Sequence, residues 1–271
     1  MQKKLFEFGD LFWVPEFYHA FLRRFMGALY KIFGYHKLWL PELNAFVEKS
    51  GGKVLDPCAG SGYVDALLIK EMQQRDIKFY LSDFMIHKNP EFREHINSLG
   101  DPRIHYLEQS IDVLMDNPDF RCPKIFINAF HHFDDEQVAQ ICKLNLSHGD
   151  DILVLEYCDN AFVSYLSMLF GPLIAMILLP FITERRQLLI TAVFTYLIPI
   201  VPVMLLWDGF VSNLRCYSHR SLKHIVYNAG FSSAEVKTTF RRSWLYPAGV
   251  TSHHIVAPPG AKKSNDSDDE V

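Results

Sequence analysis

The chain has 271 residues, a length that allows one large domain or two small ones. Hydrophobic residues make up 49% and charged residues 21%, which excludes a disordered chain. The formal net charge of -4 disfavours binding along a nucleic-acid backbone, so no nucleic-acid partner is expected. The five cysteines include no C-x-x-C pair, which argues against a disulfide framework or a zinc knuckle and fits a reducing compartment.

Residues 1–48 form an aromatic-rich N-terminal segment. Apolar residues recur there at helical spacing from Glu16 to Phe33, which predicts a helix. Two roles stay open for it. The helix packs on the core, or it faces a membrane or a substrate, because aromatic residues beside Arg23, Arg24 and Lys31 suit an interface.

Strands alternate with helices through residues 49–160, and the pattern resumes in residues 208–258. This alternation predicts an α/β fold of Rossmann-like type, a mostly parallel seven-stranded sheet with helices on both faces. The expected strands are 53–56, 77–82, 104–107, 124–129, 152–157, 234–240 and 252–256, and the expected helices are 64–74, 134–146 and 218–229.

Residues 161–207 interrupt this pattern with an apolar insertion, which has no charged residue outside Glu184–Arg186. Each apolar stretch is close to the roughly 20 residues that cross a bilayer as a helix, so we expect a helical hairpin in a membrane, spanning it twice or re-entrant. A domain of this size is expected to lack a second core that would cover the hairpin; a buried soluble hairpin or a dimer surface is the alternative. Residues 259–271 are expected to be a solvated acidic tail. Four prolines should kink the hairpin: Pro172, Pro180, Pro199 and Pro202.

A glycine-rich turn follows the first predicted strand, with the sequence DPCAGSG from Asp56 to Gly62. Glycines at such a turn let the backbone approach a ligand closely, which suits a dinucleotide or an adenosyl cofactor. The dinucleotide fingerprint requires glycine where this chain has Asp65, so that cofactor is disfavoured. Asp83 ends the second predicted strand, where its carboxylate accepts the ribose hydroxyls of an adenosine or instead caps a helix.

These motifs together resemble the class I S-adenosylmethionine-dependent methyltransferases: a strand, D-x-x-x-G-S-G, an acid after the second strand, and Phe130–Phe133 after the fourth. The segments Glu7–Pro15 and Trp207–Tyr217 look like a subgroup of that superfamily with an apolar insertion after strand five. The resemblance implies S-adenosylmethionine as cofactor. Cys58 stands where the family has its first glycine, and Ser110 where it has an adenine-contacting acid. The cofactor contacts implied by the resemblance are Asp56, Cys58, Ala59, Gly60, Gly62, Asp83, Ser110, Ile111, Asn128 and Ala129.

Three side chains are candidates for the chemistry because they follow neighbouring strands that end at one edge of the sheet. His131 and His132 come after the fourth strand and Glu156 ends the fifth, and a histidine suits a general base. The alternative is that one histidine caps the helix near Asp134 and the other contacts the cofactor. His131, His132 and Asp134 do not have a recognised ligand spacing, so no metal is expected.

The acceptor is expected between Phe130 on one side and Asp208, Arg215 and Tyr217 on the other. An arginine beside an apolar insertion suits an anionic headgroup, although an Arg215–Asp208 structural pair is equally open. The sequence therefore predicts a membrane-associated methyltransferase acting on a lipid or another apolar small molecule, with its catalytic domain facing the cytosol. The alternatives are a non-catalytic membrane scaffold or cofactor sensor, and a soluble small-molecule or protein methyltransferase.

Overall fold

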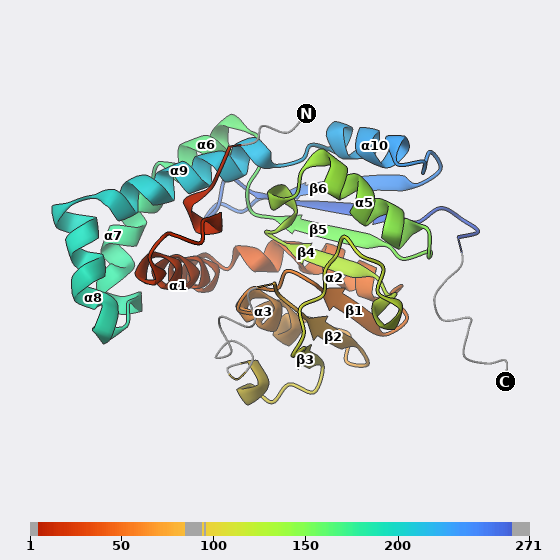
Figure 1. The fold of residues 1–271 in the computed structure, drawn as a ribbon, viewed down its shortest axis with the longest axis horizontal. Coiled ribbons are helices and arrows are strands. Elements are labelled where there is room, and N and C mark those ends of the chain that lie inside the picture. Colours follow the sequence, from red (N-terminus) through yellow and green to blue (C-terminus); the bar gives the residue numbers. More distant parts are fainter. Residues whose placement is uncertain (1–4, 85–93, 95, 262–271) are drawn as a thin grey trace.

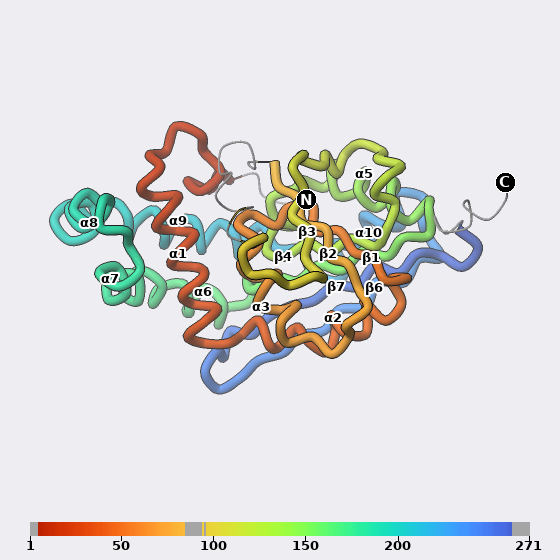
Figure 2. Tube along the Cα trace, turned by 90° about the horizontal axis from the view of Figure 1, so that it is seen from below, coloured from red at the N-terminus to blue at the C-terminus, as the bar shows by residue number. Residues whose placement is uncertain are grey.

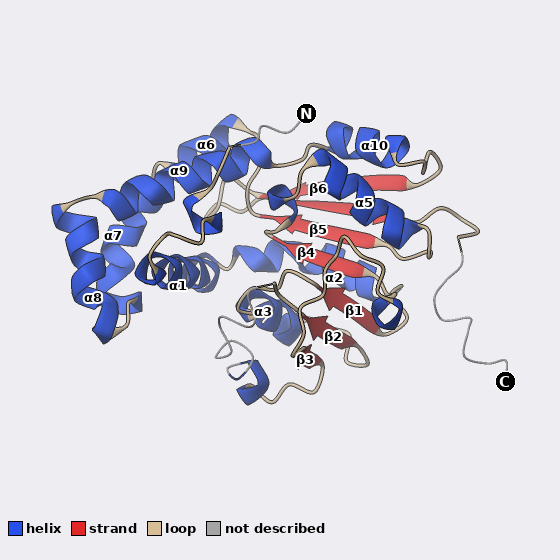
Figure 3. Cartoon of the chain, in the orientation of Figure 1, coloured by secondary structure: helices blue, strands red, loops and turns tan. Residues whose placement is uncertain are grey.

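The computed structural model describes residues 5–84, 94 and 96–261. A seven-stranded sheet in the order β3-β2-β1-β4-β5-β7-β6 forms its centre (Figures 1 and 3). Among the described strands, β7 alone runs in the opposite direction to the others. The predicted α/β fold with a mostly parallel sheet is therefore confirmed. The strands are β1 (Lys53–Asp56), β2 (Lys78–Leu81), β3 (Ile104–Tyr106), β4 (Lys124–Ile127), β5 (Ile152–Glu156), β6 (Glu235–Arg241) and β7 (Val250–Val256).

Helices cover both faces of this sheet, as the strand–helix alternation predicted. On one face α2 (Leu40–Val47) and α3 (Tyr63–Glu71) bury their apolar residues, and on the other α5 (Asp135–Leu146) and α10 (His219–Asn228) do so. Two helices begin where the sequence predicted because their capping residues are in place: Asp134 and Ser218 each form a capping box at the N-terminus of α5 and α10. The acidic tail residues 262–271 lie outside the described residues.

The predicted fourth strand was too long by two residues. It was expected to reach Ala129, but β4 ends at Ile127 because Asn128 adopts a positive φ of 51°. That conformation is costly for a residue other than glycine and turns the chain away from the sheet. The turn leads into the short 3-10 helix η4 (Phe130–His132), which places both histidines at the carboxyl edge of the sheet.

The apolar insertion leaves this same edge after β5 and projects beyond the sheet (Figure 1). Its first limb contains α6 (Phe162–Met168) and α7 (Gly171–Ile182), and its second contains α8 (Arg185–Ala192), the π-helical turn η5 (Val193–Leu197) and α9 (Ile200–Arg215). The second limb bends by 79° between η5 and α9, at the predicted kink residue Pro199.

The other three prolines produce no comparable break. Pro172 and Pro202 stand in the first turns of α7 and α9, where backbone N–H groups make no hydrogen bond within the helix, so proline removes none. Pro180 lies inside α7.

A third hydrophobic core joins the insertion to the N-terminal helix α1 (Glu16–Phe33), contrary to the expectation that nothing would cover the hairpin. Tyr18, Phe21 and Phe25 of α1 pack against Leu179 of α7 and Val201 of α9. Figure 2 shows α1 crossing over α9, with α7 and α8 to one side of it. The N-terminal helix therefore covers the inner face of the insertion, and the insertion and the sheet domain form a continuous packed structure.

The outer face of the insertion stays apolar and uncovered. Five large side chains there are more than two-thirds exposed: Phe162 (81%), Ile177 (68%), Phe181 (82%), Leu189 (78%) and Leu197 (77%). Among the described residues, one helix, Phe162–Ile182, is long and apolar enough to cross a membrane, and the bent pair 185–215 would make a second span if counted as one. Length and composition alone are weak evidence for a span, because core helices of soluble proteins pass the same test.

Candidate active site

The glycine-rich turn after β1 is ordered by the side chain that precedes it. Asp56 is fully buried, and its Oδ1 accepts a hydrogen bond from the Cys58 amide at 2.8 Å. Gly60 and Gly62 both have positive φ, +56° and +67°. A Cβ at Gly62 would lie 2.9 Å from the Ile96 side chain, whereas one at Gly60 would meet nothing within 4 Å. Position 62 thus requires glycine because a side chain would clash there, whereas the space beside the backbone of Gly60 is open.

Asp83 lies directly against this turn. Its Oδ2 accepts the Gly60 amide at 2.9 Å, and the Ala59 amide donates to the Ser82 carbonyl at 2.9 Å. The Tyr106 hydroxyl at the end of β3 donates to the Gly60 carbonyl. Three strands therefore hold the turn beside the acid.

Residues after β3 and β4 complete the same edge. The Ser82 hydroxyl accepts the Ile111 amide at 2.8 Å and donates to the Gln109 carbonyl at 3.1 Å, which holds the loop carrying Ser110 near the turn. The Asn128 side chain accepts the Tyr157 amide at 2.9 Å and donates to the Tyr30 hydroxyl. Its amide group is thereby committed to β5 and α1, so a ligand at this position meets the backbone of Asn128 and Ala129.

A buried pair of carboxyl groups supports the turn from behind. Asp56 and Asp65 are both buried, and burial together with their mutual proximity raises the pKa of Asp56 well above its ordinary value. Burial raises the pKa of Asp65 to about 7. Two carboxylates cannot both ionise cheaply at short range in a low-dielectric site, so the pair retains a proton under neutral conditions.

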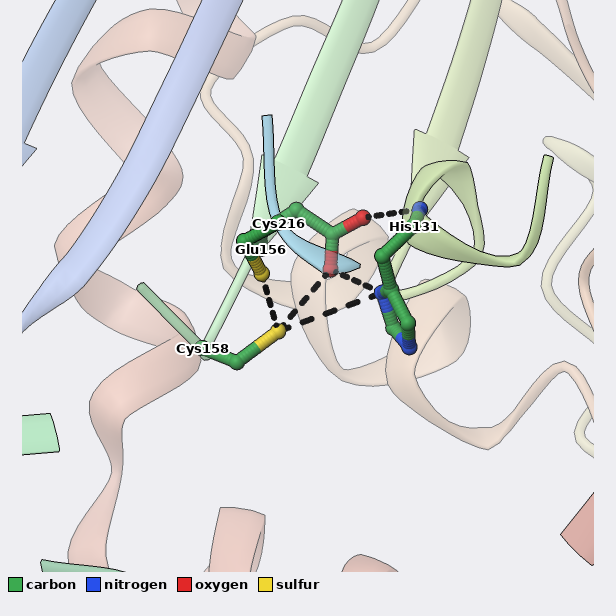
Figure 4. A group of neighbouring side chains, drawn as sticks. All are labelled: His131, Glu156, Cys158 and Cys216. Carbon is green, nitrogen blue, oxygen red and sulfur yellow. Dashed lines mark hydrogen bonds and ion pairs between the residues drawn. The ribbon is translucent and has the colours of Figure 1, made fainter. Parts of the chain in front are cut away.

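His131 and Glu156 form a second buried pair (Figure 4). Glu156 Oε2 lies 2.8 Å from His131 Nδ1, and Oε1 accepts the amides of Phe130 at 3.0 Å and His131 at 3.2 Å. Burial by itself would lower the pKa of His131, but the Glu156 carboxylate and Cys158 raise it well above its ordinary value. Burial would raise the pKa of Glu156, and His131 lowers it instead. The pair is accordingly ionic, and a protonated His131 is not a base.

His132 lies at the surface beside this pair, with ring centroids 4.3 Å apart. Its Nδ1 lies 3.0 Å from a carboxylate oxygen of Asp10, which comes from the N-terminal segment. Arg215 donates to Asp10 and to Glu7, each at 3.1 Å, and to the His132 carbonyl at 2.9 Å. Burial would raise the pKa of Asp10, but His132 and Arg215 lower it to about 2. The carboxylate is therefore charged and orients the imidazole.

Asp208 and Arg215 do not pair with each other, so that alternative from the sequence is wrong. Asp208 on α9 accepts the amides of Phe8 at 2.6 Å and Gly9 at 3.0 Å, and the Tyr18 hydroxyl at 2.8 Å. Both side chains bind the N-terminal segment, since α9 carries them to the place where that segment crosses the edge. The carboxylate of Asp208 is therefore bound by the N-terminal segment and α1, and it does not face an acceptor as the sequence predicted.

The prediction that Phe130 and Tyr217 line the acceptor pocket does not match their burial. Phe130 is 1% exposed and Tyr217 is 7% exposed. Their rings pack edge to face at 6.0 Å within the core between the sheet and α5, and the Tyr217 hydroxyl donates to the Phe133 carbonyl at 2.8 Å.

Sequence reasoning missed the part of Glu7 and Asp10 in this site. They are about 120 residues or more from the histidines in the chain, and the only signal was the resemblance of the segment Glu7–Pro15 to other sequences. Among the predicted residues, the turn, Asp83, Ser110, Ile111, Asn128 and Ala129 follow β1 to β4 at the carboxyl edge of the sheet. His131, His132 and Glu156 lie together farther along this edge, after β4 and at the end of β5.

Solved structures with a similar arrangement include methyltransferases. The pyocyanin biosynthetic protein PhzM matches with a TM-score of 0.52 and 13% identity, covering 89% of this chain and 61% of that protein. A SAM-dependent methyltransferase from Aquifex aeolicus matches with a TM-score of 0.46 and 15% identity, covering 80% of this chain and 88% of that one. Magnesium protoporphyrin IX methyltransferase from Synechocystis PCC 6803, solved with bound SAH, has a TM-score of 0.44 and 12% identity, covering 82% and 83%.

No family model matches the chain, and no curated protein sequence matches it. The sheet order and the antiparallel β7 agree with the resemblance seen in the sequence. The chain therefore has the Rossmann-like fold of the class I S-adenosylmethionine-dependent methyltransferases. At these identities the likeness defines the fold, and the chemistry has to be argued from the site itself.

The buried acid pair predicts a pH-dependent stability. Because the pKa of Asp65 is raised from 3.8 to about 7 on folding, the folded state binds more protons than the unfolded state between these values. The free energy of unfolding should thus fall as pH rises from about 4 to about 7, by roughly a few kcal/mol. Asp65→Asn should flatten this decline, measured as the melting temperature across that range.

Asp76→Asn is the matched control, because Asp76 is a solvent-exposed acid in the loop before β2. It should keep the decline of the wild type. An Asp65→Asn protein whose melting temperature still falls over this range as steeply as that of the wild type would disprove a role for the pair.

Proposed function

We propose that the protein is an S-adenosylmethionine-dependent methyltransferase that works at a membrane surface on a lipid or another apolar acceptor. The observation that carries the proposal is the pairing of the open glycine turn with Asp83 at the carboxyl edge of a methyltransferase sheet. His132, held by Asp10, lies farther along this edge, after β4. Ligands of open α/β sheets bind at such an edge.

The residues present fit an adenosyl cofactor. The open face of Gly60 admits a ligand against the backbone, and Asp83 ends β2 where a carboxylate can accept ribose hydroxyls. The loop of Ser110 and Ile111 is tied back to Ser82, and the backbone of Asn128 and Ala129 faces the same edge. S-adenosylmethionine, when bound, supplies an activated methyl group, so the protein's task is alignment of the acceptor and removal of its proton.

His132 is the residue we assign to that proton. A base must be accessible to the acceptor, and the His132 side chain is 36% exposed whereas that of His131 is 3% exposed. The Asp10 carboxylate at Nδ1 favours the tautomer that leaves Nε2 unprotonated, so Nε2 can take a proton. His131 and Glu156 position the histidine turn, since Glu156 binds the backbone amides of Phe130 and His131.

The exposed face of the insertion supports membrane association. Burying each large apolar side chain contributes roughly 1.5–3 kcal/mol, and several of them face outward on α6, α7, α8 and η5. Phe12 and Trp13 of the N-terminal segment are also exposed, at 88% and 62%, and aromatic residues favour membrane interfaces. Arg185 and Arg186 at the hairpin turn disfavour translocation, which favours a re-entrant insertion with the catalytic domain in the cytosol.

The cofactor assignment predicts direct binding. Full-length protein in detergent should bind S-adenosylmethionine or S-adenosylhomocysteine in calorimetry. Asp83→Ala removes charge-assisted hydrogen bonds worth roughly 1.5–3 kcal/mol each, so the Kd should rise about tenfold or more. Gly60→Val should weaken binding as well, because it places a side chain on the open face.

Asp76→Asn serves again as the control and should leave the Kd unchanged. A protein that binds a nicotinamide dinucleotide and neither sulfur nucleoside would show that the cofactor assignment is wrong.

If the acceptor is a lipid or another apolar molecule, the protein should transfer methyl groups into a lipid fraction. Protein in liposomes, given S-adenosylmethionine with a labelled methyl group and a fractionated cell extract, should label material that partitions into the organic phase. His132→Gln should lower the rate by roughly 100-fold or more while leaving cofactor affinity intact. Label in the aqueous or protein fraction would favour the soluble-acceptor alternative, and cofactor binding without label in any fraction would favour the non-catalytic one.

Membrane association predicts that charges on the outer face of the insertion abolish vesicle binding. Phe181→Glu with Leu189→Glu should reduce co-sedimentation with phosphatidylcholine–phosphatidylglycerol vesicles by roughly tenfold or more, because each change replaces an exposed apolar side chain, available for burial in the bilayer, with a charge. The matched control is Met115→Glu with Tyr227→Glu, two exposed residues outside the insertion at 67% and 63%. Equal loss in both double variants would contradict a membrane role for the insertion.

A further inference from the structure

Four side chains of metal-ligand type meet beside the histidine turn: His131, Glu156, Cys158 and Cys216 (Figure 4). His131 comes from the turn after β4, and Glu156 and Cys158 stand at the end of β5 and just beyond it. Cys216 follows directly after α9, where the insertion returns to the domain. One ligand atom of each residue lies within 4.8 Å of the ligand atoms of the other three.

The distances are close to those of a tetrahedral site. Cys158 Sγ lies 3.6 Å from Glu156 Oε2 and 3.9 Å from His131 Nδ1. A zinc ion with bonds of about 2.0–2.3 Å places its ligand atoms about 3.3–3.8 Å apart. Two other contacts, 2.8 Å between Nδ1 and Oε2 and 2.7 Å between the two sulfurs, are shorter, so these atoms must move apart by about an ångström to admit an ion.

The chemistry of the donor set selects the ion. Two thiols with an imidazole are ligands of borderline-soft cations such as Zn²⁺, and they do not suit Mg²⁺ or Ca²⁺, which take oxygen ligands. The carboxylate of Glu156 is already held in position, because its Oε1 accepts hydrogen bonds from the amides of Phe130 and His131. These bonds fix the direction of Oε2. Three of the four residues are almost fully buried, which shields the group from competing water: His131 (2%), Glu156 (3%) and Cys158 (1%).

We propose that His131, Glu156, Cys158 and Cys216 bind a structural Zn²⁺ ion. Loading releases both thiol protons and the proton held between His131 and Glu156, so that the ion meets two thiolates, a neutral imidazole and a carboxylate. Four protein ligands leave no open position on the ion, so it staples the fold and does not activate water. This inference stands on the side-chain geometry and is independent of the proposed methyl transfer.

The two cysteines lie on either side of the insertion in the chain, so the ion would join its two ends. Cys158 precedes α6 and Cys216 follows α9, so the ion closes residues 159–215, which include the whole insertion, into a loop. The sequence shows no ligand motif because the four ligands come from three separate segments. Zinc would therefore fix the insertion against the edge that carries His132, whatever membrane forces act on its tip.

The test measures metal directly in the full-length protein, purified in detergent under reducing conditions without chelator from zinc-supplemented medium. Mass-spectrometric metal analysis should find one zinc per chain, and Cys158→Ser or Cys216→Ser should each lose most of it. Cys122→Ser is the matched control, because Cys122 is a buried free cysteine outside the group, and it should retain the metal.

A second measurement does not depend on any variant folding. Wild-type protein stripped by a chelator and loaded with Co²⁺ should show the thiolate-to-cobalt charge-transfer absorption of a tetrahedral site with sulfur ligands. Wild-type protein without that absorption, or zinc content that Cys158→Ser and Cys122→Ser change equally, would overturn the proposal. So would metal-free protein in which peptide mapping finds Cys158 and Cys216 joined as a disulfide.

Discussion

The carboxylate of Glu156 is the contact on which the functional edge depends. It ends β5 in a fully covered position, yet its two oxygens bind the amides of Phe130 and His131 and the imidazole of His131. A buried charge is stable only when it is paired and hydrogen-bonded, so the turn after β4 must take the one shape that satisfies it. That shape sets the position of His132, and it also brings Cys158 against His131.

A second layer of polar contacts ties the apolar insertion to this edge. Asp208 and Arg215, both on α9, bind the N-terminal segment through Phe8, Gly9, Glu7 and Asp10, and Asp10 in turn holds His132. Arg215 on α9 and the His132 imidazole are thereby connected through the carboxylate of Asp10. The third hydrophobic core adds rigidity, because α1 packs against α7 and α9 on one side and places Tyr30 in the main core on the other.

The two neighbouring histidines at this edge have different surroundings, although they are adjacent in the sequence. His131 is buried, ion-paired and close to two thiols, which suits holding the fold together. His132 is partly exposed, and its Nδ1 is paired with the Asp10 carboxylate, which agrees with the base that we propose. The two rings lie against each other with centroids 4.3 Å apart, yet only the His132 side chain reaches solvent: it is 36% exposed, whereas that of His131 is 3% exposed.

The sequence by itself determined the α/β fold, the strand bounds to within about two residues, the glycine turn with Asp83, and the place of the insertion. These depend on local periodicity, capping residues and short motifs, which the chain carries within a few residues of one another. Only the tertiary structure decided the partners of Asp208 and Arg215, the burial of Phe130 and Tyr217, and the meeting of His131, Glu156, Cys158 and Cys216. Those contacts join residues up to 208 positions apart, and such pairs are set by how helices and strands pack, which no local pattern records.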